Sequence, residues 1–384
     1  MNTKSILIVK LSAIGDVVHC LPVLEVLRKN YPDARIDWVV EQDAADILEG
    51  HPLLNRLIIS RRKSWQKDLP GIKCLPAVRD VFRFLRELRS QYYDLVIDLQ
   101  GLFKSGVITG LSKGGRKIGM TGSREGAEWF LNEKPVPVDY STHAVKRYLS
   151  VTEYLGLETH EWVGGIPVSG RDVHSIEKVF ETFGLGKRPL VAVNPMAKWT
   201  TKLWKTEHFA LLSDRVIDEL GCDIIFTGSS GDRAVLDEIR ERMHNRAPNL
   251  AGLTSLKELS VLYQRSALMI TTDTGPMHIA AAMGCPVIAL FGPTSPYRTG
   301  PYGKGHTVIR KRLECGPCFR RRCGNPRCMN EISVDAVFEV VKKRLAEKAG
   351  KPEPEAEQEI RSTSDGFNIK QKGGTPDGNK QRTA

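Results

Sequence analysis

The chain has 384 residues, of which 41% are hydrophobic and 26% are charged, and its formal net charge is +11. This length and hydrophobic content allow more than one buried core, so two domains of ordinary size are expected. No apolar run reaches the roughly 18 residues that a membrane-spanning helix needs, and the run Ile6–Val9 is too short for the core of a secretory signal. The sequence therefore predicts a protein that stays in the cytosol.

The positive charge indicates an acidic partner, which could be nucleic acid, anionic lipid or a phosphorylated sugar. The basic residues concentrate in three stretches: Arg61, Arg62, Lys63 and Lys67 around Trp65; Arg79, Arg83, Arg86 and Arg89 at helical spacing; and Arg310, Lys311, Arg312 and Arg320 to Arg322. No RNA-binding aromatic signature, zinc-finger spacing or recognition-helix pattern accompanies them. Nucleic acid is therefore not the expected partner.

The first predicted element is a buried strand over Ile6–Val9, followed by a turn that contains Ser12 and Gly15. An apolar-periodic segment through Leu27 then predicts a helix. In open α/β sheets the carboxyl ends of the strands are where ligands bind. Asp16 falls at the start of the predicted helix, where a carboxylate is electrostatically favoured. It is therefore either a helix cap or part of a ligand site.

Strand-like and helix-like segments alternate along most of the chain, which is typical of parallel sheets with crossover helices. The predicted strands are 36–40, 57–60, 94–99, 189–194, 222–227, 268–272 and 286–291. The predicted helices include 78–91, 207–220, 233–244 and 256–265.

The alternation pauses near 163–171 and restarts at Pro189, so we expect one domain over 1–170 and a second over 171–345. From about Ala346 the chain is acidic, then polar and Gly-rich. Such a segment cannot bury enough apolar area to order itself, so 346–384 is expected to be a disordered tail.

Three loops of the second predicted domain follow predicted strands and have phosphate-binding chemistry. The loop 194–204 carries Thr200, Thr201 and Lys202, and a lysine there can neutralise a leaving phosphate. At Asp273–Gly275 a strand meets a helix that begins near Pro276, which creates an anion site of free amides. The third loop ends at Asp232, a candidate acceptor for a ribose hydroxyl. Each loop alone could be an ordinary cap or turn, but together they favour a bound nucleotide diphosphate.

These motifs resemble glycosyltransferase family 9, the bacterial lipopolysaccharide heptosyltransferases, and among them heptosyltransferase I most. The similar segments are the opening turn, Asp37–Glu41, Tyr93–Ser105, His143–Arg147, Lys202–Trp204, Asp273–His278 and Leu290–Pro296. The resemblance covers about residues 5 to 345. One departure is Lys205, because the Lys-x-Trp motif usually continues with proline.

The resemblance implies a GT-B fold, in which two Rossmann-like, doubly wound parallel-sheet domains face each other across a cleft. The N-terminal domain would take the Kdo sugars of the lipid A inner core, and the C-terminal domain would take ADP-L-glycero-D-manno-heptose. Transfer would invert the anomeric centre and need no cofactor or metal ion. The sequence agrees on the metal, since it has no Asp-x-Asp pair.

The resemblance also implies roles for individual residues. Asp16 matches the family's general base, and a carboxylate in the cleft can accept the proton of the attacking hydroxyl; Lys202 would assist the leaving diphosphate. The expected donor-binding residues are Thr200, Thr201, Lys202, Asp232, Asp273, Thr274, Gly275 and His278. The expected acceptor-binding residues are Lys10, Ser12, Gly15, Arg61, Arg62, Lys63, Gln100, Lys104, Arg124, His143 and Arg147.

Some of these residues have a plainer interpretation as well. His278 is either in the site or a packed structural histidine, and Arg61–Lys63 is either an acceptor site or a solvated charged face. Lys10 lies within the strand that enters the turn, where an unpaired charge would be costly, so a partner is expected.

Four of the eight cysteines form a cluster in sequence, Cys315, Cys318, Cys323 and Cys328. In a cytosolic chain this pattern indicates a structural zinc or iron–sulfur site, or reduced or redox-active thiols. The other four cysteines lie in apolar contexts typical of small core residues.

Three functions remain open from the sequence. The leading one is transfer of heptose to Kdo-lipid A at the inner face of the inner membrane, with transient contact to the membrane surface. The second is a family 9 transferase that uses a later, heptosylated acceptor or another nucleotide sugar. The third is a non-catalytic protein that binds lipopolysaccharide or carbohydrate, which the retention of both Asp16 and Lys202 disfavours.

Overall fold

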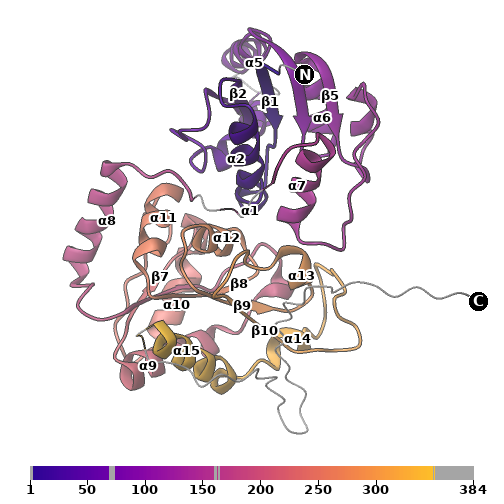
Figure 1. Ribbon diagram of the computed structural model, residues 1–384. Helices are drawn as coiled ribbons and strands as arrows, with labels where there is room; N and C mark the ends of the chain where they lie inside the picture. The colour runs from indigo at the N-terminus through magenta and orange to yellow at the C-terminus, as the bar shows by residue number, and fades with distance from the viewer. Residues whose placement is uncertain (1–2, 69–73, 160–161, 163–164, 349, 351–384) are drawn as a thin grey trace, which may run out of the picture.

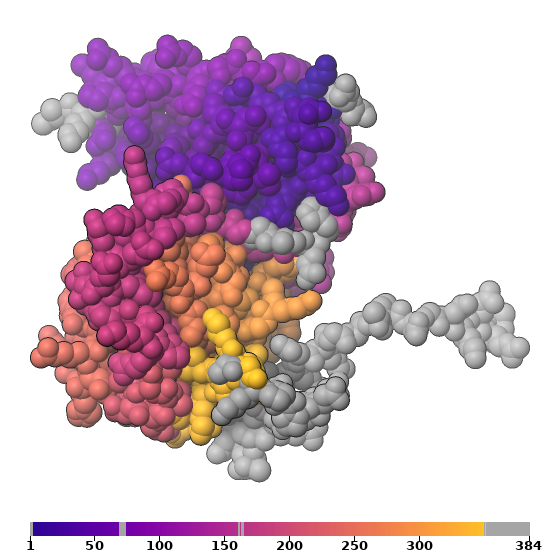
Figure 2. Space-filling model, turned by 60° about the vertical axis from the view of Figure 1, so that its left-hand side comes forward, coloured from indigo at the N-terminus to yellow at the C-terminus, as the bar shows by residue number. Residues whose placement is uncertain are grey.

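The computed structural model describes residues 3–68, 74–159, 162, 165–348 and 350. It folds into two α/β lobes, the first stacked on the second (Figures 1 and 2). Each lobe is built on a five-stranded sheet whose strands pair in parallel. This confirms the predicted α/β class and the two parallel sheets of a GT-B fold.

The sheet of the first lobe has the strand order β3-β2-β1-β4-β5. Its strands are β1 (Ser5–Val9), β2 (Arg35–Glu41), β3 (Arg56–Ser60), β4 (Tyr92–Asp98) and β5 (Lys113–Gly119). Its helices are α1 (Ile14–Val18), α2 (Leu21–Asn30), α3 (Gln42–Ala45), α4 (Arg62–Asp68), α5 (Cys74–Leu88), α6 (Phe103–Leu111), the 3₁₀ turn η1 (Ala127–Phe130) and α7 (Ala144–Tyr154).

The central strand β1 is fully buried, and its side chains alternate between two apolar cores. Ile6 and Ile8 pack in the core that contains residues of α2 and α7. Leu7 and Val9 pack in a smaller core with Phe84 of α5. Helices therefore cover both faces of this sheet, and the carboxyl end of β1 emerges between neighbours at the same edge.

The sheet of the second lobe has the strand order β10-β9-β8-β6-β7. Its strands are β6 (Leu190–Asn194), β7 (Asp223–Phe226), β8 (Leu268–Thr272), β9 (Val287–Phe291) and β10 (Thr307–Arg310). Its helical segments are α8 (Gly170–Phe183), η2 (Thr200–Lys202), α9 (Thr206–Leu220), η3 (Ser230–Asp232), α10 (Arg233–Glu241), α11 (Leu256–Arg265), α12 (Gly275–Ala282), α13 (Pro296–Thr299), α14 (Arg327–Asn330) and α15 (Val334–Lys348).

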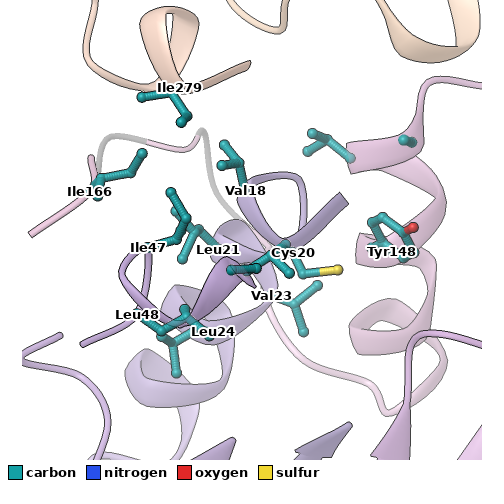
Figure 3. Close-up of a cluster of buried hydrophobic side chains, with 14 of the residues drawn as sticks. Val18, Cys20, Leu21, Val23, Leu24, Ile47, Leu48, Tyr148, Ile166 and Ile279 are labelled. Atoms are coloured by element: carbon teal, nitrogen blue, oxygen red, sulfur yellow. The ribbon is translucent and has the colours of Figure 1, made fainter. Parts of the chain in front are cut away.

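The two lobes share apolar packing. The largest buried cluster includes Val18 and Leu21 from the first lobe, Ile279 from α12 of the second, and Ile166 from the segment between the lobes. Figure 3 shows Ile279 and Val18 approaching each other, with Ile166 alongside. The lobes thus meet through side chains next to the turn that carries Asp16.

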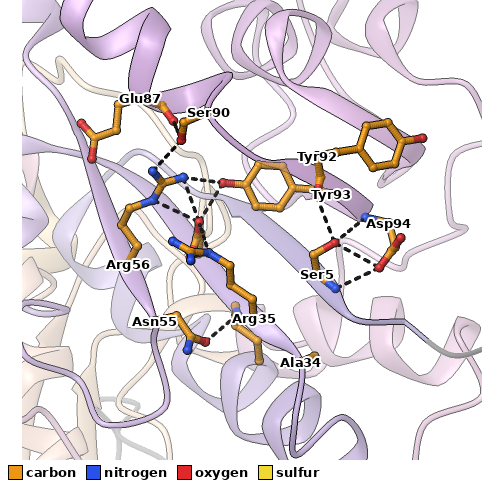
Figure 4. A network of polar contacts seen from close by, with 12 residues as sticks. Ser5, Ala34, Arg35, Asn55, Arg56, Glu87, Ser90, Tyr92, Tyr93 and Asp94 are labelled. Carbon is orange, nitrogen blue, oxygen red and sulfur yellow. Dashed lines mark hydrogen bonds and ion pairs between the residues drawn. The ribbon is translucent and has the colours of Figure 1, made fainter.

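A polar network stabilises the edge of the first sheet at which its strands begin, opposite the edge that carries Asp16 (Figure 4). The fully buried Asp37 carboxylate accepts from Tyr93 OH at 2.8 Å and pairs with Arg56 Nη2 at 2.9 Å. Arg56 Nη1 also donates to Ser90 Oγ at 2.8 Å, just beyond the end of α5. A buried charge satisfied by several hydrogen bonds holds its surroundings rigidly, so β2, β3, β4 and α5 form one firm unit.

The strands predicted from apolar runs are all present, with small shifts at their ends. The edge strands β5 and β10 were not predicted, because neither has a continuous apolar run; β5 reads Lys-Gly-Gly-Arg-Lys-Ile-Gly. The helix expected from Asp16 through Leu27 is two helices, α1 and α2, with a break at His19 and Cys20. The helix predicted over 78–91 runs from Cys74 to Leu88.

The region between the predicted domains leads into α8. This helix packs on the second lobe, where the Arg265 guanidinium of α11 lies 4.2 Å from the centre of the Phe180 ring. Residues 163 and 164 of the predicted boundary lie outside the described residues, as do 351–384 of the predicted tail. Helix α15 continues to Lys348, slightly past the predicted end of the second domain. In the described parts of the chain, no helix is both long and apolar enough to cross a bilayer.

Candidate active site

Asp16 lies in the first turn of α1, directly after the carboxyl end of β1, and its side chain is half-buried. Its Oδ2 accepts a hydrogen bond from the Ala13 N–H at 3.3 Å, which is the predicted cap. Its Oδ1 accepts from Tyr148 OH at 3.4 Å. Both contacts are long, and a carboxylate has room for about four donors. The Asp16 carboxylate therefore retains accepting capacity for a further hydroxyl.

Lys10 stands behind this carboxylate. Its Nζ donates to Tyr148 OH at 2.8 Å and to the Leu99 carbonyl at 3.0 Å, which confirms the expected partner for a charge at this position. Burial opposes the charge on Lys10, but nearby Tyr148 and Asp16 raise its pKa above the ordinary value overall. Lys10 is only 2% exposed, so its ammonium is enclosed by the protein behind Tyr148.

Tyr148 connects the two charges. Burial and the negative charge of Asp16 raise the pKa of Tyr148, so its hydroxyl stays protonated and donates to Asp16 while it accepts from Lys10. The sequence reasoning did not single out this tyrosine. The available signal was its position directly after Arg147, at the end of a motif that was singled out.

The turn itself is held by residues from β4, α6 and β2. Gln100 Oε1 accepts from two backbone N–H groups of the turn, including that of Ser12 at 3.0 Å. Lys104 Nζ donates to Ser12 Oγ and to Glu41 Oε1, both at 2.8 Å. Glu41, which is buried, also pairs with Arg62 Nε at 3.1 Å. Glu41 thus gathers two predicted acceptor-binding cations next to the turn.

The other basic residues of the first lobe differ in their surroundings. Arg61 pairs with Asp80 at 3.6 Å, and Lys63 pairs with Asp43. Arg124 is exposed, and its backbone N–H donates to the carbonyl of Gly101. Ion pairs at the surface are weak and exchange easily with an incoming anion. These side chains line the same carboxyl edge but are not drawn into one cluster.

His143 is the N-cap residue of α7 and Arg147 lies in its first turn, at the end of the helix that contacts the second lobe. His143 Nδ1 accepts from Val145 N–H at 3.2 Å and so caps the helix, while its Nε2 donates to the Gly300 carbonyl of the second lobe at 3.0 Å. Both ring nitrogens are therefore occupied by protein contacts. The Arg147 guanidinium, 8% exposed, lies 4.8 Å from the ring centre of Tyr140.

In the second lobe the carboxyl ends of β6 and β8 are adjacent, and they bring Lys202 and Asp273 together. Lys202 Nζ lies 2.6 Å from Asp273 Oδ2, and the ion pair is largely buried. Thr294 Oγ1 donates to the same carboxylate oxygen at 2.6 Å. The Lys202 ammonium also lies 4.6 Å from the centre of the Trp199 ring. Asp273 thus holds the lysine at the start of α12.

The neighbouring hydroxyls point in different directions. Thr274 is the N-cap residue of α12, and within the described residues no side-chain capping hydrogen bond is made there, so the backbone N–H groups of the first turn other than that of Pro276 are available to an anion. Thr200 is exposed, whereas Thr201 is buried and its hydroxyl donates to the Arg320 carbonyl at 2.8 Å. The hydroxyl of Thr201 therefore donates its proton to a protein carbonyl, and its expected contact with the donor stays a prediction.

Asp232 closes its own loop. Its Oδ2 accepts from the backbone N–H of Ser229 at 2.7 Å and from Ser229 Oγ at 2.6 Å, in the manner of a helix cap. The other carboxylate oxygen has no hydrogen bond among the described residues, and the side chain is only partly buried. The predicted ribose contact would have to use that second oxygen.

The two helix starts, α1 and α12, meet across the lobes. A Cβ atom added to Gly15 would lie 2.3 Å from His278 Cδ2, so the close approach requires glycine. One added to Gly275 would lie 3.4 Å from Ile14 Cβ. This contact sets Asp16, the residue after Gly15, beside the start of α12.

His278 is 7% exposed and packs edge-on against His19, with ring centres 4.2 Å apart. Burial lowers the pKa of His278 to about 4, so the ring is neutral near pH 7. Of the two interpretations that the sequence left open, the geometry corresponds to a packed histidine at the lobe contact. His19, which the sequence reasoning did not single out, belongs to the same cluster.

The four clustered cysteines belong to the segment whose Arg320 carbonyl accepts from Thr201 in the loop of Lys202. All are free thiols, and burial together with the neighbouring thiols raises the pKa of Cys328. Within the described residues, no three or more histidine, cysteine or acidic side chains are arranged to hold a metal ion. The cysteine segment also contacts the loop of Lys202 through Arg321, whose guanidinium lies 5.1 Å from the centre of the Trp199 ring.

In the comparison with protein families, residues 81–328 match the model of glycosyltransferase family 9 (heptosyltransferase). Among curated proteins, the chain is 30% identical to lipopolysaccharide heptosyltransferase 1 of Pseudomonas aeruginosa over 337 residues, covering 83% of this chain and 87% of that one. It is also 30% identical to lipopolysaccharide heptosyltransferase 3 of Escherichia coli K12, covering 73% of this chain and 80% of that one.

Among solved structures, the E. coli heptosyltransferase WaaC with ADP matches with a TM-score of 0.71 and 27% sequence identity, covering 88% of this chain and 99% of that chain. The same enzyme with ADP-2-deoxy-2-fluoro heptose matches with a TM-score of 0.68 and 26% identity, with the same coverage. The similarity therefore spans both lobes.

Proposed function

Because the chain belongs to glycosyltransferase family 9 and is a heptosyltransferase of lipopolysaccharide core assembly, we propose that it transfers L-glycero-D-manno-heptose from ADP-heptose to Kdo of the lipid A inner core. The observation that carries this proposal is that Asp16 lies beside the start of α12, because the preceding residue, Gly15, contacts His278. In this proposal the base and the anion site lie on opposite sides of that contact.

The donor would lie on the second lobe. The Lys202 ammonium and the free amides at the start of α12 supply positive charge where the diphosphate of ADP-heptose would lie. Positive charge fixed at that point stabilises the diphosphate more as it leaves than before, so it accelerates the reaction. In this proposal Lys202, which Asp273 already orients, also donates hydrogen bonds to the diphosphate. No metal ion or other cofactor takes part.

The acceptor would lie on the first lobe, with Asp16 as the general base. The carboxylate accepts the proton of the attacking Kdo hydroxyl while that oxygen forms a bond to the anomeric carbon of heptose. The bond from that carbon to the diphosphate oxygen breaks in the same step, so configuration inverts and ADP leaves with the electron pair. Tyr148, with Lys10 behind it, orients the Asp16 carboxylate through its hydroxyl.

The cations at the carboxyl edge of the first lobe suit the carboxylates and phosphates of the acceptor. Lys104 and Arg62 are held by Glu41, and Arg61, Lys63 and Arg124 are exposed. Arginine binds carboxylate and phosphate groups in a two-pronged manner. Since this acceptor is anchored in the inner membrane, the enzyme would work in the cytoplasm at the inner face of that membrane.

A second candidate is transfer to a later acceptor that already carries heptose. The observation that favours it is the 30% identity to lipopolysaccharide heptosyltransferase 3 of E. coli, equal to the identity with heptosyltransferase 1 of P. aeruginosa. The two candidates differ only in the sugar that Asp16 would face.

The test is to incubate the purified full chain with ADP-heptose and either Kdo2-lipid A or its heptosylated form, with a metal chelator present, and to measure product masses. We expect the mass of one heptose to be added to Kdo2-lipid A in the presence of the chelator. Addition to the heptosylated form alone would favour the second candidate. Loss of all transfer on chelation would contradict the proposed metal independence.

A further inference from the structure

Helix α5 buries one face and exposes an apolar opposite face. Its inner side chains Ala77, Phe84 and Leu88 are buried against the first sheet. On the outer side Leu75 is 74% exposed and Phe82 is 68% exposed. Residues seven apart lie on the same face of a helix, so these two large side chains form one outward stripe. Water contact at both is costly and calls for a partner surface.

Arginines fill the rest of that stripe. Arg79 lies four residues after Leu75 and three before Phe82, and Arg86 lies four residues after Phe82. These spacings place both arginines on the same face of the helix as the two apolar residues, and both are exposed. Among the described residues neither has an ion-pair partner. Arg83, at the border of the stripe, has its side chain 68% exposed and pairs with Asp80 at 3.5 Å. The outer face of α5 is thus apolar and strongly basic together.

The helix is attached to the acceptor side of the first lobe. The Asp80 carboxylate, on the flank of α5, accepts from Trp65 Nε1 at 2.7 Å and pairs with Arg61 at 3.6 Å. Trp65 lies within α4, and Arg61 directly precedes this helix. Helix α4 follows the carboxyl end of β3. Since β4 begins at the opposite edge of the sheet, α5 starts near the carboxyl edge and runs away from it for about 22 Å at 1.5 Å per residue.

We propose that the outer face of α5, defined by Leu75, Arg79, Phe82 and Arg86, docks on an anionic lipid bilayer. This inference rests on the proposed function only in that a lipid-anchored acceptor would give such docking a use. The two apolar side chains would insert at the level of the headgroups, and the arginines would pair with lipid phosphates.

Charge complementarity selects this occupant. An interfacial helix that binds anionic lipid combines bulky apolar side chains with lysine or arginine on adjoining positions, and each basic residue near such a surface contributes about 1 kcal/mol. A second copy of this chain would bring the same arginines face to face, and like charges repel. The network around Asp37 and Arg56 also ties the end of α5 to the sheet, so docking would orient the whole first lobe.

The test measures sedimentation of the full chain with phosphatidylglycerol-containing vesicles and with phosphatidylcholine vesicles, at low and high salt. We expect binding to the anionic vesicles that weakens as salt rises. The double variant Leu75→Ser/Phe82→Ser should lower the partition coefficient about tenfold, since each side chain loses part of its apolar transfer energy. Arg79→Gln/Arg86→Gln should lower it about 30-fold at low salt, from two losses of about fivefold each.

The matched control is Leu211→Ser/Leu253→Ser, which removes two leucines exposed by 53% and 60% on the second lobe and should leave vesicle binding unchanged. Transfer to detergent-dispersed acceptor should be equal in all three variants and the wild type, whereas transfer to vesicle-embedded acceptor should fall in the two α5 variants. Equal vesicle binding by the wild type and the α5 variants would overturn the proposal. So would dimerisation of the wild type, seen by analytical ultracentrifugation, that the α5 variants abolish.

The two proposals fail separately. If the wild type binds anionic vesicles through α5 but adds no heptose to any acceptor, docking stands and the proposed function fails. If it adds heptose to dispersed acceptor but does not bind vesicles, the proposed function stands and docking fails.

Discussion

In each lobe a central strand is followed by a short helix, and an aspartate lies in the first turn of that helix or just before it. The two aspartates have different environments. Asp16 follows β1, is half-buried and has two long hydrogen bonds. Asp273 follows β8, is 6% exposed and is bound at 2.6 Å by both Lys202 and Thr294. A carboxylate whose hydrogen bonds are long is available to accept a proton, whereas one bound closely to a lysine serves to position that cation. The two aspartates occupy similar positions in the sequence pattern, and the side chains that surround each one determine its role.

The strongest test of this comparison is Asp16→Asn. If Asp16 is the general base, kcat should fall by about 10² to 10⁴, because an amide cannot accept the proton. The affinity for ADP, measured by calorimetry, and the free energy of unfolding should remain near those of the wild type. A kcat within a factor of about two of the wild type would remove Asp16 from the mechanism.

The matching change in the second lobe, Asp273→Asn, should act on stability. It leaves the largely buried Lys202 without its carboxylate, which costs about 3 to 5 kcal/mol in the free energy of unfolding. Urea denaturation measures this loss. The control is Asp273→Asn/Lys202→Met, which removes both charges and should recover much of the stability. If Asp273→Asn and Asp16→Asn cost the same stability, the contrast between the two aspartates is wrong.

Acid should weaken the contact between the lobes. Burial lowers the pKa of His278 to about 4 from an ordinary 6.5, so between these values the unfolded chain binds a proton that the folded chain does not. The stability contributed by neutral His278 is complete above pH 6.5 and is lost as pH falls toward 4, by about 3 kcal/mol. Asp16 and Asp273 oppose this shift, whereas His143 and Lys202 add to it.

Urea denaturation of the wild type and of His278→Gln across this pH range measures the effect. The variant should lose stability less steeply on acidification. Some slope should remain, because burial and the neighbouring His143, both of which the variant keeps, also lower the pKa of His19. Equal slopes in the two proteins would show that His278 does not titrate in this way.

The smallest expected effect comes from Tyr148→Phe, which removes the hydroxyl between Lys10 and Asp16. Lys10 keeps its bond to the Leu99 carbonyl, so the free energy of unfolding should fall by about 2 kcal/mol. The rate should fall far less than in Asp16→Asn, since the base itself is retained. Measured kcat values for the two variants decide this point. An equal loss of rate in both would make Tyr148 part of the chemistry and not only of the orientation of Asp16.

Local patterns were sufficient to predict much of the fold. The strand over Leu268–Thr272 and the helix over Leu256–Arg265 have the predicted bounds, because a buried strand and an amphipathic helix carry their periodicity in the sequence. The edge strands β5 and β10 escaped prediction because a strand with a half-exposed face and glycines has no such run.

The candidate site was predictable only in part. The turn after β1 and the loop at Asp273 could be found, since each combines a strand end, small residues and a polar side chain. Glu41, Tyr148 and Thr294 could not be assigned, because each acts through a partner far away in the chain: Glu41 through Lys104, Tyr148 through Lys10, and Thr294 through Asp273.

The sequence by itself determined the α/β class, the two parallel sheets and the family, because periodicity and short motifs are local properties. It also placed Asp16 and Lys202 in segments that follow the carboxyl ends of β1 and β6. Only the tertiary structure decided that Asp16 keeps free accepting capacity while Asp273 is paired, that Lys10 lies behind Tyr148, and that Gly15 meets His278 across the lobes. Burial and pairing depend on which residues meet in space, and those meetings join segments that are far apart along the chain.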